Sequence, residues 1–371
     1  MTILGAALVW GAEGRHKLWD LDLSRFTNHQ EDVARVVWGI RFSPDETKVA
    51  IGFGPSLDRD PRPRRVVEVA VGQPRTALRE FELKDSGRLL PFGNNLSWSP
   101  SGTILVVRTQ TPAMLRLDTE APCILPKESE FGGFLSEDRM VIRHQAGLNE
   151  PTEIQILKPD CMLADSWKMS ALARVLDTSP EQDLLAIVTS PTPPALVVEL
   201  VTSRTHEVKQ RWTDVESTPD LLFSDQGRLI CGSKVLAGKP LPDVACWDTR
   251  TGAKTAEDDK IGADLPAIES AEGNFLAITD YKYAALPWKS LWEFFDLGSV
   301  YIAPKRRLIW NVRTGKEVAS WGMGGLPQEE RWTSPKEVRT IKTKFVLSLS
   351  PTGKYVAEGG SGSVSVFAVQ P

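Results

Sequence analysis

A short turn motif recurs along the chain and restricts its fold more than any other feature of the sequence. Its clearest copy is Ser-Pro-Thr-Gly at 350–353, which stands between two apolar segments. Proline presets φ and glycine permits a positive φ, so the motif is typical of a tight turn between antiparallel strands. Related copies begin at Ser43, Ser99 and Ser179, and weaker copies begin at Ser136, Ser224 and Ser270. The sequence therefore predicts seven strand–turn–strand units.

The copies recur at a period typical of a propeller blade. Four of the six intervals between successive repeat serines are 37 to 46 residues, near the ~40–45 residues of a four-stranded blade. A short apolar run follows each turn, as at 184–188, which indicates a strand buried on both faces. Third strands ending in Thr-Gly follow most clearly at 245–252 and 308–315. We therefore expect an all-β, single seven-bladed β-propeller.

The motifs identify a resemblance to a known family. Ser-Pro-x-Gly before an apolar strand, and Trp-Asp-x-x-Thr-Gly at 247–252 one strand later, resemble the repeat of WD40 β-propellers. The resemblance covers nearly the whole chain. The Gly-His dipeptide that opens the family's blades is missing, since His29 lies too far from Ser43. We therefore expect tryptophan and aliphatic packing between blades to hold the ring together.

The two ends of the chain are expected to complete one blade together. The last repeat ends at 371 after three strands, whereas the segment 17–23 precedes the first repeat and has no repeat of its own. An N-terminal strand would supply the missing fourth strand and remove an open sheet edge. We expect the propeller to span 13–371. Residues 1–12 are interpreted either as a remnant of a secretory signal or as a first strand.

Composition and motifs favour a binding protein over an enzyme. The net charge of −4 argues against a nucleic-acid partner, which usually requires a basic domain, and no apolar run is long enough for a membrane span. The four histidines lack metal-chelating spacing, and no complete P-loop is present. We therefore assign no catalytic residue, cofactor or metal ligand. The alternative is a hydrolase or quinoprotein-like propeller whose metal or substrate site is assembled from several blades at the mouth of the central tunnel.

Three insertions are predicted to build a partner face. They cover 55–65, 281–307 and 324–340 and fall in connections that leave an antiparallel blade at the same end. Because the ring closes, the blades that carry them (6, 7 and 1) are neighbours. The alternative is that insertions accumulate in loops because loops tolerate them. We favour a non-enzymatic scaffold that uses these loops to bind a protein or peptide partner.

Each insertion contributes candidate partner-binding residues. The first is rich in arginine and could meet an acidic partner. In the second, Pro287 is expected to begin a short inserted helix with an apolar stripe on one face, ending near Gly298. That stripe either packs on the propeller or docks a partner or a second copy. The candidate residues are Arg62, Arg64, Arg65, Trp288, Leu291, Trp292, Phe295 and Trp332.

The cysteines bear on the compartment. Cys231 and Cys246 lie on the expected second and third strands of one repeat. Buried free thiols are the favoured interpretation, and a disulfide across the two strands is the alternative if the protein is exported. The sequence leans towards an exported or periplasmic protein, with a cytoplasmic protein as the alternative. It leaves partner identity and oligomeric state open.

Overall fold

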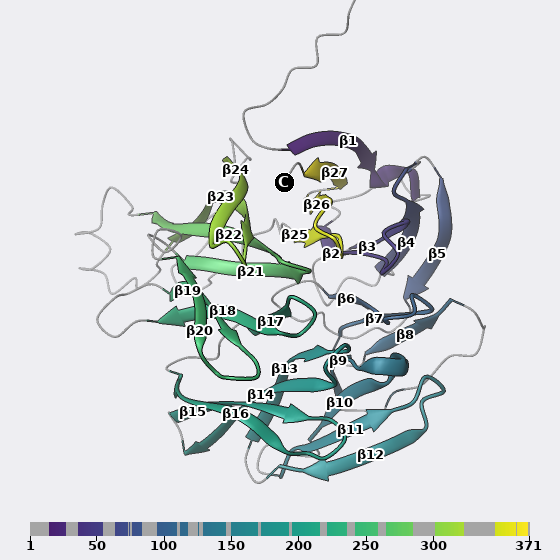
Figure 1. Cartoon of the computed structure of the whole chain (residues 1–371). Coiled ribbons are helices and arrows are strands. Elements are labelled where there is room, and N and C mark those ends of the chain that lie inside the picture. The colour runs from purple at the N-terminus through teal and green to yellow at the C-terminus, as the bar shows by residue number, and fades with distance from the viewer. Residues whose placement is uncertain are drawn as a thin grey trace, which may run out of the picture.

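Seven antiparallel sheets follow one another around a ring in the computed structural model of the chain (Figure 1). The prediction of a single seven-bladed propeller is confirmed. The structure describes residues 15–26, 36–54, 64–72, 74, 76–83, 95–109, 112–117, 125, 129–145, 150–169, 172–192, 195–215, 221–235, 242–258, 265–284, 301–322, 346–360 and 362–369.

The strands of each blade are named a to d from the ring axis outwards. Blade 1 contains β2 (Val36–Phe42), β3 (Lys48–Gly54), β4 (Arg64–Ala70) and β5 (Ala77–Leu83). Blade 2 contains β6 (Leu96–Trp98), β7 (Ile104–Val107) and β8 (Ala113–Arg116). Blade 3 contains β9 (Ser129–Phe134), β10 (Met140–His144), β11 (Glu153–Leu157) and β12 (Leu163–Lys168). Blade 4 contains β13 (Leu172–Ser179), β14 (Leu184–Thr192), β15 (Ala195–Thr202) and β16 (Val208–Val215).

The remaining blades complete the ring. Blade 5 contains β17 (Leu221–Ser224), β18 (Leu229–Val235), β19 (Pro242–Asp248) and β20 (Lys254–Asp258). Blade 6 contains β21 (Leu265–Glu272), β22 (Phe275–Ala284), β23 (Tyr301–Asn311) and β24 (Lys316–Gly322). Blade 7 contains β25 (Val346–Leu349), β26 (Tyr355–Gly359), β27 (Ser363–Val369) and β1 (Arg15–Asp22). Two short 3₁₀ turns, η1 (Leu23–Phe26) and η2 (Ser136–Asp138), are the helical elements among the described residues, where no helix is long and apolar enough to cross a membrane.

The repeat serines close the a–b turns by a shared pattern of hydrogen bonds. The main-chain N–H of Ser43 donates to the carbonyl of Lys48 (2.9 Å), and the Ser43 hydroxyl accepts from the N–H of Lys48 (3.0 Å). The same two bonds join two further pairs, Ser99 with Ile104 and Ser350 with Tyr355. Serine suits this position because its hydroxyl satisfies a backbone group at the start of strand b.

The N-terminal strand closes the ring, as the sequence predicts. Strand β1 pairs antiparallel with β27, from Arg15 opposite Val369 to Asp22 opposite Ser363, and Figure 1 shows the purple β1 beside the yellow β27. Side chains reinforce this pairing. Glu358 of β26 forms an ion pair with Arg15 of β1 at 3.0 Å.

The hydrophobic core lies mainly between neighbouring blades. One cluster joins Trp38 of blade 1 to Leu105 of blade 2, and another joins Trp321 of blade 6 to Leu347 of blade 7. Trp38 has its ring directly over Gly52, where an added Cβ would lie 2.3 Å from the ring. Each large apolar side chain removed from water contributes about 1.5–3 kcal/mol. Tryptophan and aliphatic packing between blades is therefore present as expected.

The structure differs from the sequence prediction in the segment 281–307. Strands β22 and β23 extend into both ends of this segment, and their ladder runs from Phe275 opposite Asn311 to Ala284 opposite Tyr301. Both ends of the segment, 281–284 and 301–307, therefore extend the β22–β23 hairpin of blade 6. The helix predicted from Pro287 lies outside the described residues.

Candidate functional site

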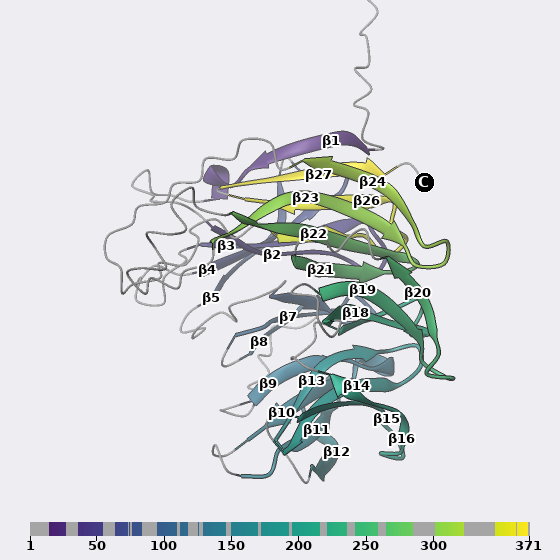
Figure 2. The same ribbon diagram turned by 90° about the vertical axis from the view of Figure 1, so that its left-hand side faces the viewer.

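The two longest connections between described strands begin at the same end of blade 6. In each blade, the b–c and d–a connections lie at this end, which we call the b–c face, and the a–b and c–d connections lie at the other, the a–b face. Strands β3, β22 and β24 end at the b–c face, where the connections 55–63, 285–300 and 323–345 begin. Connections at least as long as 55–63 also join blades 1 and 2, at 84–95, and blades 2 and 3, at 117–128. In Figure 2 the strands of blade 6 run across the view, with the turn between β23 and β24 on the right.

The blades that carry the connections 55–63, 285–300 and 323–345 are neighbours. A core cluster contains Val37 of blade 1 together with Ala357 of blade 7, and a second contains Ile309 of blade 6 together with Val356 of blade 7. The described strand ends next to these three connections therefore belong to one continuous sector of the b–c face.

Two of the sequence-predicted partner-binding residues lie in strand β4. Arg64 is 7% exposed, so its side chain belongs to the interior of the sheet. Arg65 donates to the carbonyl of Phe26 (3.0 Å) and pairs with Glu82 (3.5 Å), which attaches η1 to blade 1. The other six candidates lie outside the described residues, namely Arg62, Trp288, Leu291, Trp292, Phe295 and Trp332.

A group of charged residues lies near the b–c ends of the inner strands of blades 3 and 4. Glu130 of β9 accepts from Arg143 of β10 (3.1 Å) and from Arg174 of β13 (3.2 Å). Arg143 also donates through Nε to the carbonyl of Ala173 (2.6 Å). These bonds tie blade 3 to blade 4 and use both oxygens of the Glu130 carboxylate.

Arg108 of blade 2 interacts electrostatically with this group. It follows directly after β7, and its main-chain N–H donates to the carbonyl of Asn95 (2.8 Å). Burial lowers the pKa of its guanidinium; Glu130 and Asp177 oppose that shift, and Arg174 and Arg41 reinforce it. Its Nε is buried and has no hydrogen-bond partner among the described residues, whereas the side chain as a whole is partly exposed.

A second charged group lies nearer the a–b face. Arg41 of blade 1 reaches past blade 7 to blade 6, where it donates to the hydroxyl of Ser270 (3.2 Å) and pairs with Glu272 (3.3 Å). Burial raises the pKa of Glu272, against the opposing effect of Arg41. Burial also raises the pKa of Asp177 in β13 to about 6, although Asp177 accepts a hydrogen bond from the N–H of Phe223 (2.7 Å).

We call these seven side chains the axial cluster: Arg41, Arg108, Glu130, Arg143, Arg174, Asp177 and Glu272. It contains four arginines and three carboxylates, and Arg41, Arg143 and Arg174 form ion pairs with Glu272 and Glu130. Within the described part of the chain, no group of three or more His, Cys, Asp or Glu side chains could hold a metal ion. Elemental analysis of the purified protein tests the alternative of an enzyme with a metal at the tunnel mouth, because such an enzyme would contain bound metal.

Sequence reasoning missed the axial cluster, although one signal was present. Arg41 and Asp177 each stand two residues before a repeat serine, Ser43 and Ser179. Since alternate strand residues share a face, this position points in a constant direction from blade to blade. Aligning the repeats on their serines and looking for charged residues two positions earlier would have found both.

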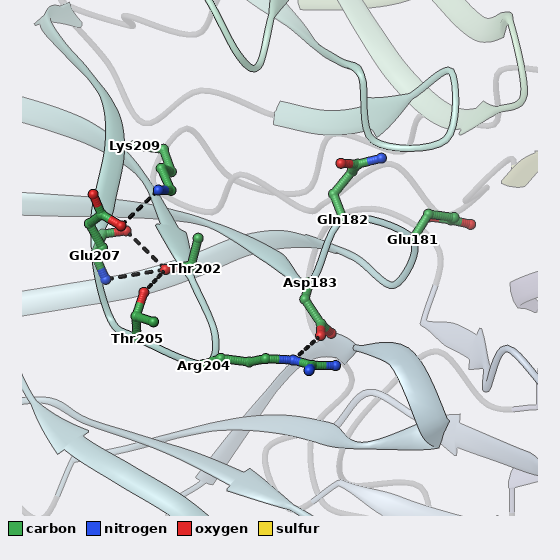
Figure 3. A pocket seen from close by; sticks show the side chains of 8 residues that line it. All are labelled: Glu181, Gln182, Asp183, Thr202, Arg204, Thr205, Glu207 and Lys209. Carbon is green, nitrogen blue, oxygen red and sulfur yellow. Dashed lines mark hydrogen bonds and ion pairs between the residues drawn. The ribbon is translucent and has the colours of Figure 1, made fainter.

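A small pocket of about 380 Å³ lies on the a–b face of blade 4 (Figure 3). Its charged and polar side chains pair with one another. Arg204 binds Asp183 (2.9 Å), Lys209 binds Glu207 (2.7 Å), and the hydroxyl of Thr202 contacts that of Thr205 (2.6 Å). Because these groups form hydrogen bonds and ion pairs with one another, we interpret the pocket as a pair of turns stabilised by internal contacts.

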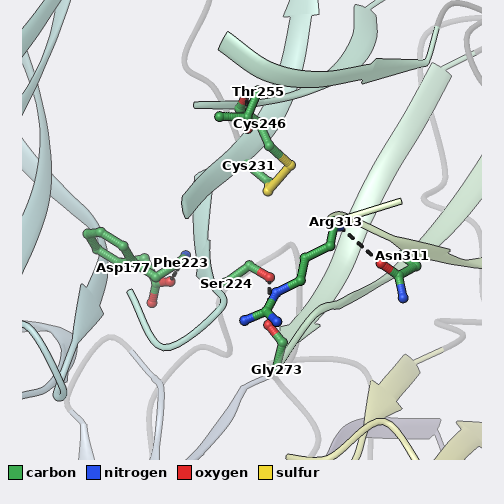
Figure 4. The surroundings of a disulfide bond; sticks show 9 residues. All are labelled: Asp177, Phe223, Ser224, Cys231, Cys246, Thr255, Gly273, Asn311 and Arg313. Atoms are coloured by element: carbon green, nitrogen blue, oxygen red, sulfur yellow. Dashed lines mark hydrogen bonds between the residues drawn. A yellow bond between two sulfur atoms is a disulfide. The ribbon is translucent and has the colours of Figure 1, made fainter. Parts of the chain in front are cut away.

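Cys231 and Cys246 form a disulfide, which overturns the favoured interpretation of two free thiols (Figure 4). They stand directly opposite each other in the ladder of β18 and β19, with Cα atoms 4.0 Å apart. Both are fully buried between blades 5 and 6. Cys161 is disulfide-bonded as well. The spacing in sequence did not reveal this pairing because it depends on the register of two strands.

Comparison with known proteins agrees with the fold. No protein-family model and no curated protein matches the sequence. Among solved structures, the β-propeller domain of Cps50 (Swd1) from Myceliophteria thermophila is 11% identical with a TM-score of 0.56, covering 92% of this chain and 98% of that one. A chain of the Mitotic Checkpoint Complex is 13% identical with a TM-score of 0.57, covering all of both chains. A chain of Kuenenia stuttgartiensis hydrazine synthase is 13% identical with a TM-score of 0.56, covering 92% and 98%.

At these identities the matches establish the fold alone. Together with the seven sheets and the closing strand β1, they define the chain as a seven-bladed β-propeller, the fold that the resemblance of its turn motifs to the WD40 repeat predicts.

Proposed function

We propose that this chain is a non-enzymatic propeller that binds a protein or peptide partner on the b–c face of blades 6, 7 and 1. The observation that carries the proposal is that the two longest connections between described strands, 285–300 and 323–345, both begin at the b–c end of blade 6, in the same sector as the connection 55–63 of blade 1. The a–b turns, by contrast, are short and closed by the repeat serines. A rigid ring that carries its two longest connections in one sector is suited to present a composite binding surface.

The extended hairpin of blade 6 supports the same proposal. Its ladder continues to Ala284 and Tyr301, which gives the connecting segment 285–300 a firm base. That segment contains the apolar stripe of Trp288, Leu291 and Trp292. Tryptophan is enriched among residues that contribute most to binding interfaces. One of the matched structures is a chain of the Mitotic Checkpoint Complex.

The test replaces residues 287–298 with a glycine–serine linker of equal length and keeps strands β22 and β23 intact. The control is a chain altered at Arg204 and Thr205, on the a–b face. We expect the parent chain and the control to capture the same proteins, and the replacement variant to fail to capture them. Retention of the same partners by the replacement contradicts the proposal.

The single variant Trp292→Ala separates docking from self-packing. A docking helix keeps its melting temperature when Trp292 is truncated but loses its partner. A helix packed on the ring loses several degrees instead, because a buried aromatic truncation costs about 3–5 kcal/mol. A variant that melts much lower and still binds every partner identifies the segment as a brace, and the proposed face then loses its main support.

A further inference from the structure

The a–b turns of blades 1, 3 and 4 hold acidic residues in the left-handed conformation, which most side chains avoid. Glu46, Asp138 and Asp183 have φ values of 57°, 55° and 52°. In the a–b turns of blades 2 and 7, the residues with positive φ are Gly102 and Gly353. Glycine adopts this conformation freely, whereas another residue is strained there unless its surroundings hold it in place. The presence of acids where glycine would fit points to a role for their side chains.

Two of these carboxylates bind the a–b turn of the preceding blade in the ring. Glu46 of blade 1 accepts from the main-chain N–H (2.6 Å) and the hydroxyl (2.8 Å) of Thr352 in blade 7. Asp138 of blade 3 accepts from the main-chain N–H (2.9 Å) and the hydroxyl of Ser101 in blade 2. Each carboxylate thus binds both donors of one residue in the neighbouring turn. Hydrogen bonds to ionised groups are about twice as strong as neutral ones, so these contacts hold the turns of adjacent blades together.

Asp183 of blade 4 repeats the contact and adds ion pairs to it. It accepts from the main-chain N–H (3.3 Å) and the hydroxyl (2.7 Å) of Ser136 in blade 3. It also pairs with Arg139 of blade 3 (2.8 Å) and with Arg204 of its own blade (2.9 Å). Burial raises the pKa of Asp183, but the Ser136 hydroxyl and the two arginines outweigh this effect and hold the pKa below its usual value.

The Glu46 carboxylate is also stabilised in its ionised form. Burial raises its pKa, but hydrogen bonds from Thr352 and Ser350 and the charge of Lys354 outweigh burial and hold the pKa below its usual value. Glu272 of blade 6 also interacts electrostatically with Glu46, and as a like charge it acts in the opposite direction. A carboxyl whose folded-state pKa is lowered stabilises the protein above its unfolded pKa, and this contribution is lost as pH falls through the folded value.

We propose that Glu46, Asp138 and Asp183 are clasps that lock neighbouring blades together at the a–b face and that release in acid. Each clasp is one carboxylate bound to the N–H and the hydroxyl of one residue in the preceding blade's turn. The Glu46 clasp joins blades 1 and 7 across 306 positions of sequence. Strand β1 closes the ring at the outer edge of blade 7, so this clasp is a second closure at the turns. The clasps lie on the opposite side of the ring from the proposed partner face.

Glycine substitutions separate the clasp from the turn that carries it. Asp183→Gly and Glu46→Gly relieve the strained φ but remove the carboxylate, so each should lower the melting temperature at pH 7 by roughly 2–4 °C. The matched control is Glu137→Gly, because Glu137 has a φ of 58°, is exposed, and its side chain forms no hydrogen bond or ion pair within the described part of the chain. This control should melt at or slightly above the temperature of the parent. A clasp variant that melts as high as the parent, or a control that falls as far as the clasp variants, overturns the proposal.

A double-mutant cycle tests the contact itself. Thr352→Ala removes the hydroxyl that Glu46 binds, so it should have almost no effect when residue 46 is already glycine. The decreases in urea midpoint caused by Glu46→Gly and by Thr352→Ala should therefore not add. Additive decreases would show that the two residues act separately, and they would contradict the clasp.

Lowering the pH tests the release of the clasps. The difference in melting temperature between the parent and Asp183→Gly should shrink from pH 7 to pH 3 as the carboxylate is protonated. Glu137→Gly should stay close to the parent at both pH values. A difference between the parent and Asp183→Gly that is as large at pH 3 as at pH 7 would refute release in acid.

Discussion

Replacing Glu358 with glutamine should weaken the closure of the ring. The Glu358 carboxylate lies where blades 6 and 7 meet strand β1, and it binds Arg307 (3.0 Å), Arg15 (3.0 Å) and the indole N–H of Trp321 (2.6 Å). Arg307 is 2% exposed, so the substitution removes a charged partner from a buried cation. Glutamine keeps one acceptor oxygen but no charge.

The expected loss can be worked out from these contacts. Hydrogen bonds to charged groups contribute about 1.5–3 kcal/mol each. Because the Glu358 side chain is 19% exposed and glutamine still accepts one bond, we expect a loss of about 3 kcal/mol. An unfolding entropy of about 2.1 cal/mol/K per residue converts this to a fall of roughly 4 °C in melting temperature for a chain of this length.

The pH dependence gives the prediction a second test. Burial disfavours ionisation of Glu358, but Arg307 and Arg15 outweigh it and hold the pKa of Glu358 below its usual value. A carboxyl with a lowered folded-state pKa stabilises the protein above its unfolded pKa, and this stability is lost as pH falls through the folded value. The parent and Glu358→Gln should therefore differ at pH 7 and converge below about pH 4.

Calorimetry at pH 7 and pH 3 measures both effects. The control is Glu317→Gln, which removes an exposed partner of Arg306 and should change stability by less than about 1 kcal/mol. A melting temperature of Glu358→Gln within 1 °C of the parent at pH 7 would refute the reasoning, as would a difference of the same size at both pH values.

Three further predictions follow from the described contacts. Burial raises the pKa of Asp177 from 3.8 to about 6, so the stability of the parent chain should fall as pH rises through this window. In urea unfolding at pH 7, Asp177→Asn should therefore be more stable than the parent, by at most ~3 kcal/mol. At pH 3 the two proteins should be equally stable. Gly52→Ala would place a Cβ 2.3 Å from the ring of Trp38 and should lower stability by about 1–3 kcal/mol in urea unfolding; an unchanged midpoint would show that the ring moves freely. Thiol titration of unfolded, unreduced protein should find Cys231 and Cys246 unreactive. Two reactive thiols at these positions would exclude the disulfide and would remove the argument for an oxidising compartment.

Local turn chemistry explains why the fold could be predicted. The repeat serines and the glycines beside them act within five residues of sequence, as Ser43 with Lys48 shows, so the number and spacing of blades follow from the motif. The closing strand could be inferred because the last repeat lacked a fourth strand. The extended hairpin of β22 and β23 was missed, although its ends contain aromatic and β-branched residues that favour strands.

The axial cluster and the disulfide could not be predicted in the same way. Arg41 pairs with Glu272 across 231 positions of sequence, and their contact depends on the closure of the whole ring. Cys231 meets Cys246 only in one register of β18 and β19, because a shift of one residue would place their side chains on opposite faces. Both features arise from tertiary geometry that no local pattern encodes.

Hydrogen exchange of the chain, measured with and without a captured partner, tests the proposed binding face most directly. We expect slower exchange on binding at the b–c ends of blades 6, 7 and 1, in peptides that cover 54–64, 284–301 and 322–346. Protection centred instead on the a–b turns, such as 43–48 and 179–184, with these three segments unchanged, would contradict it.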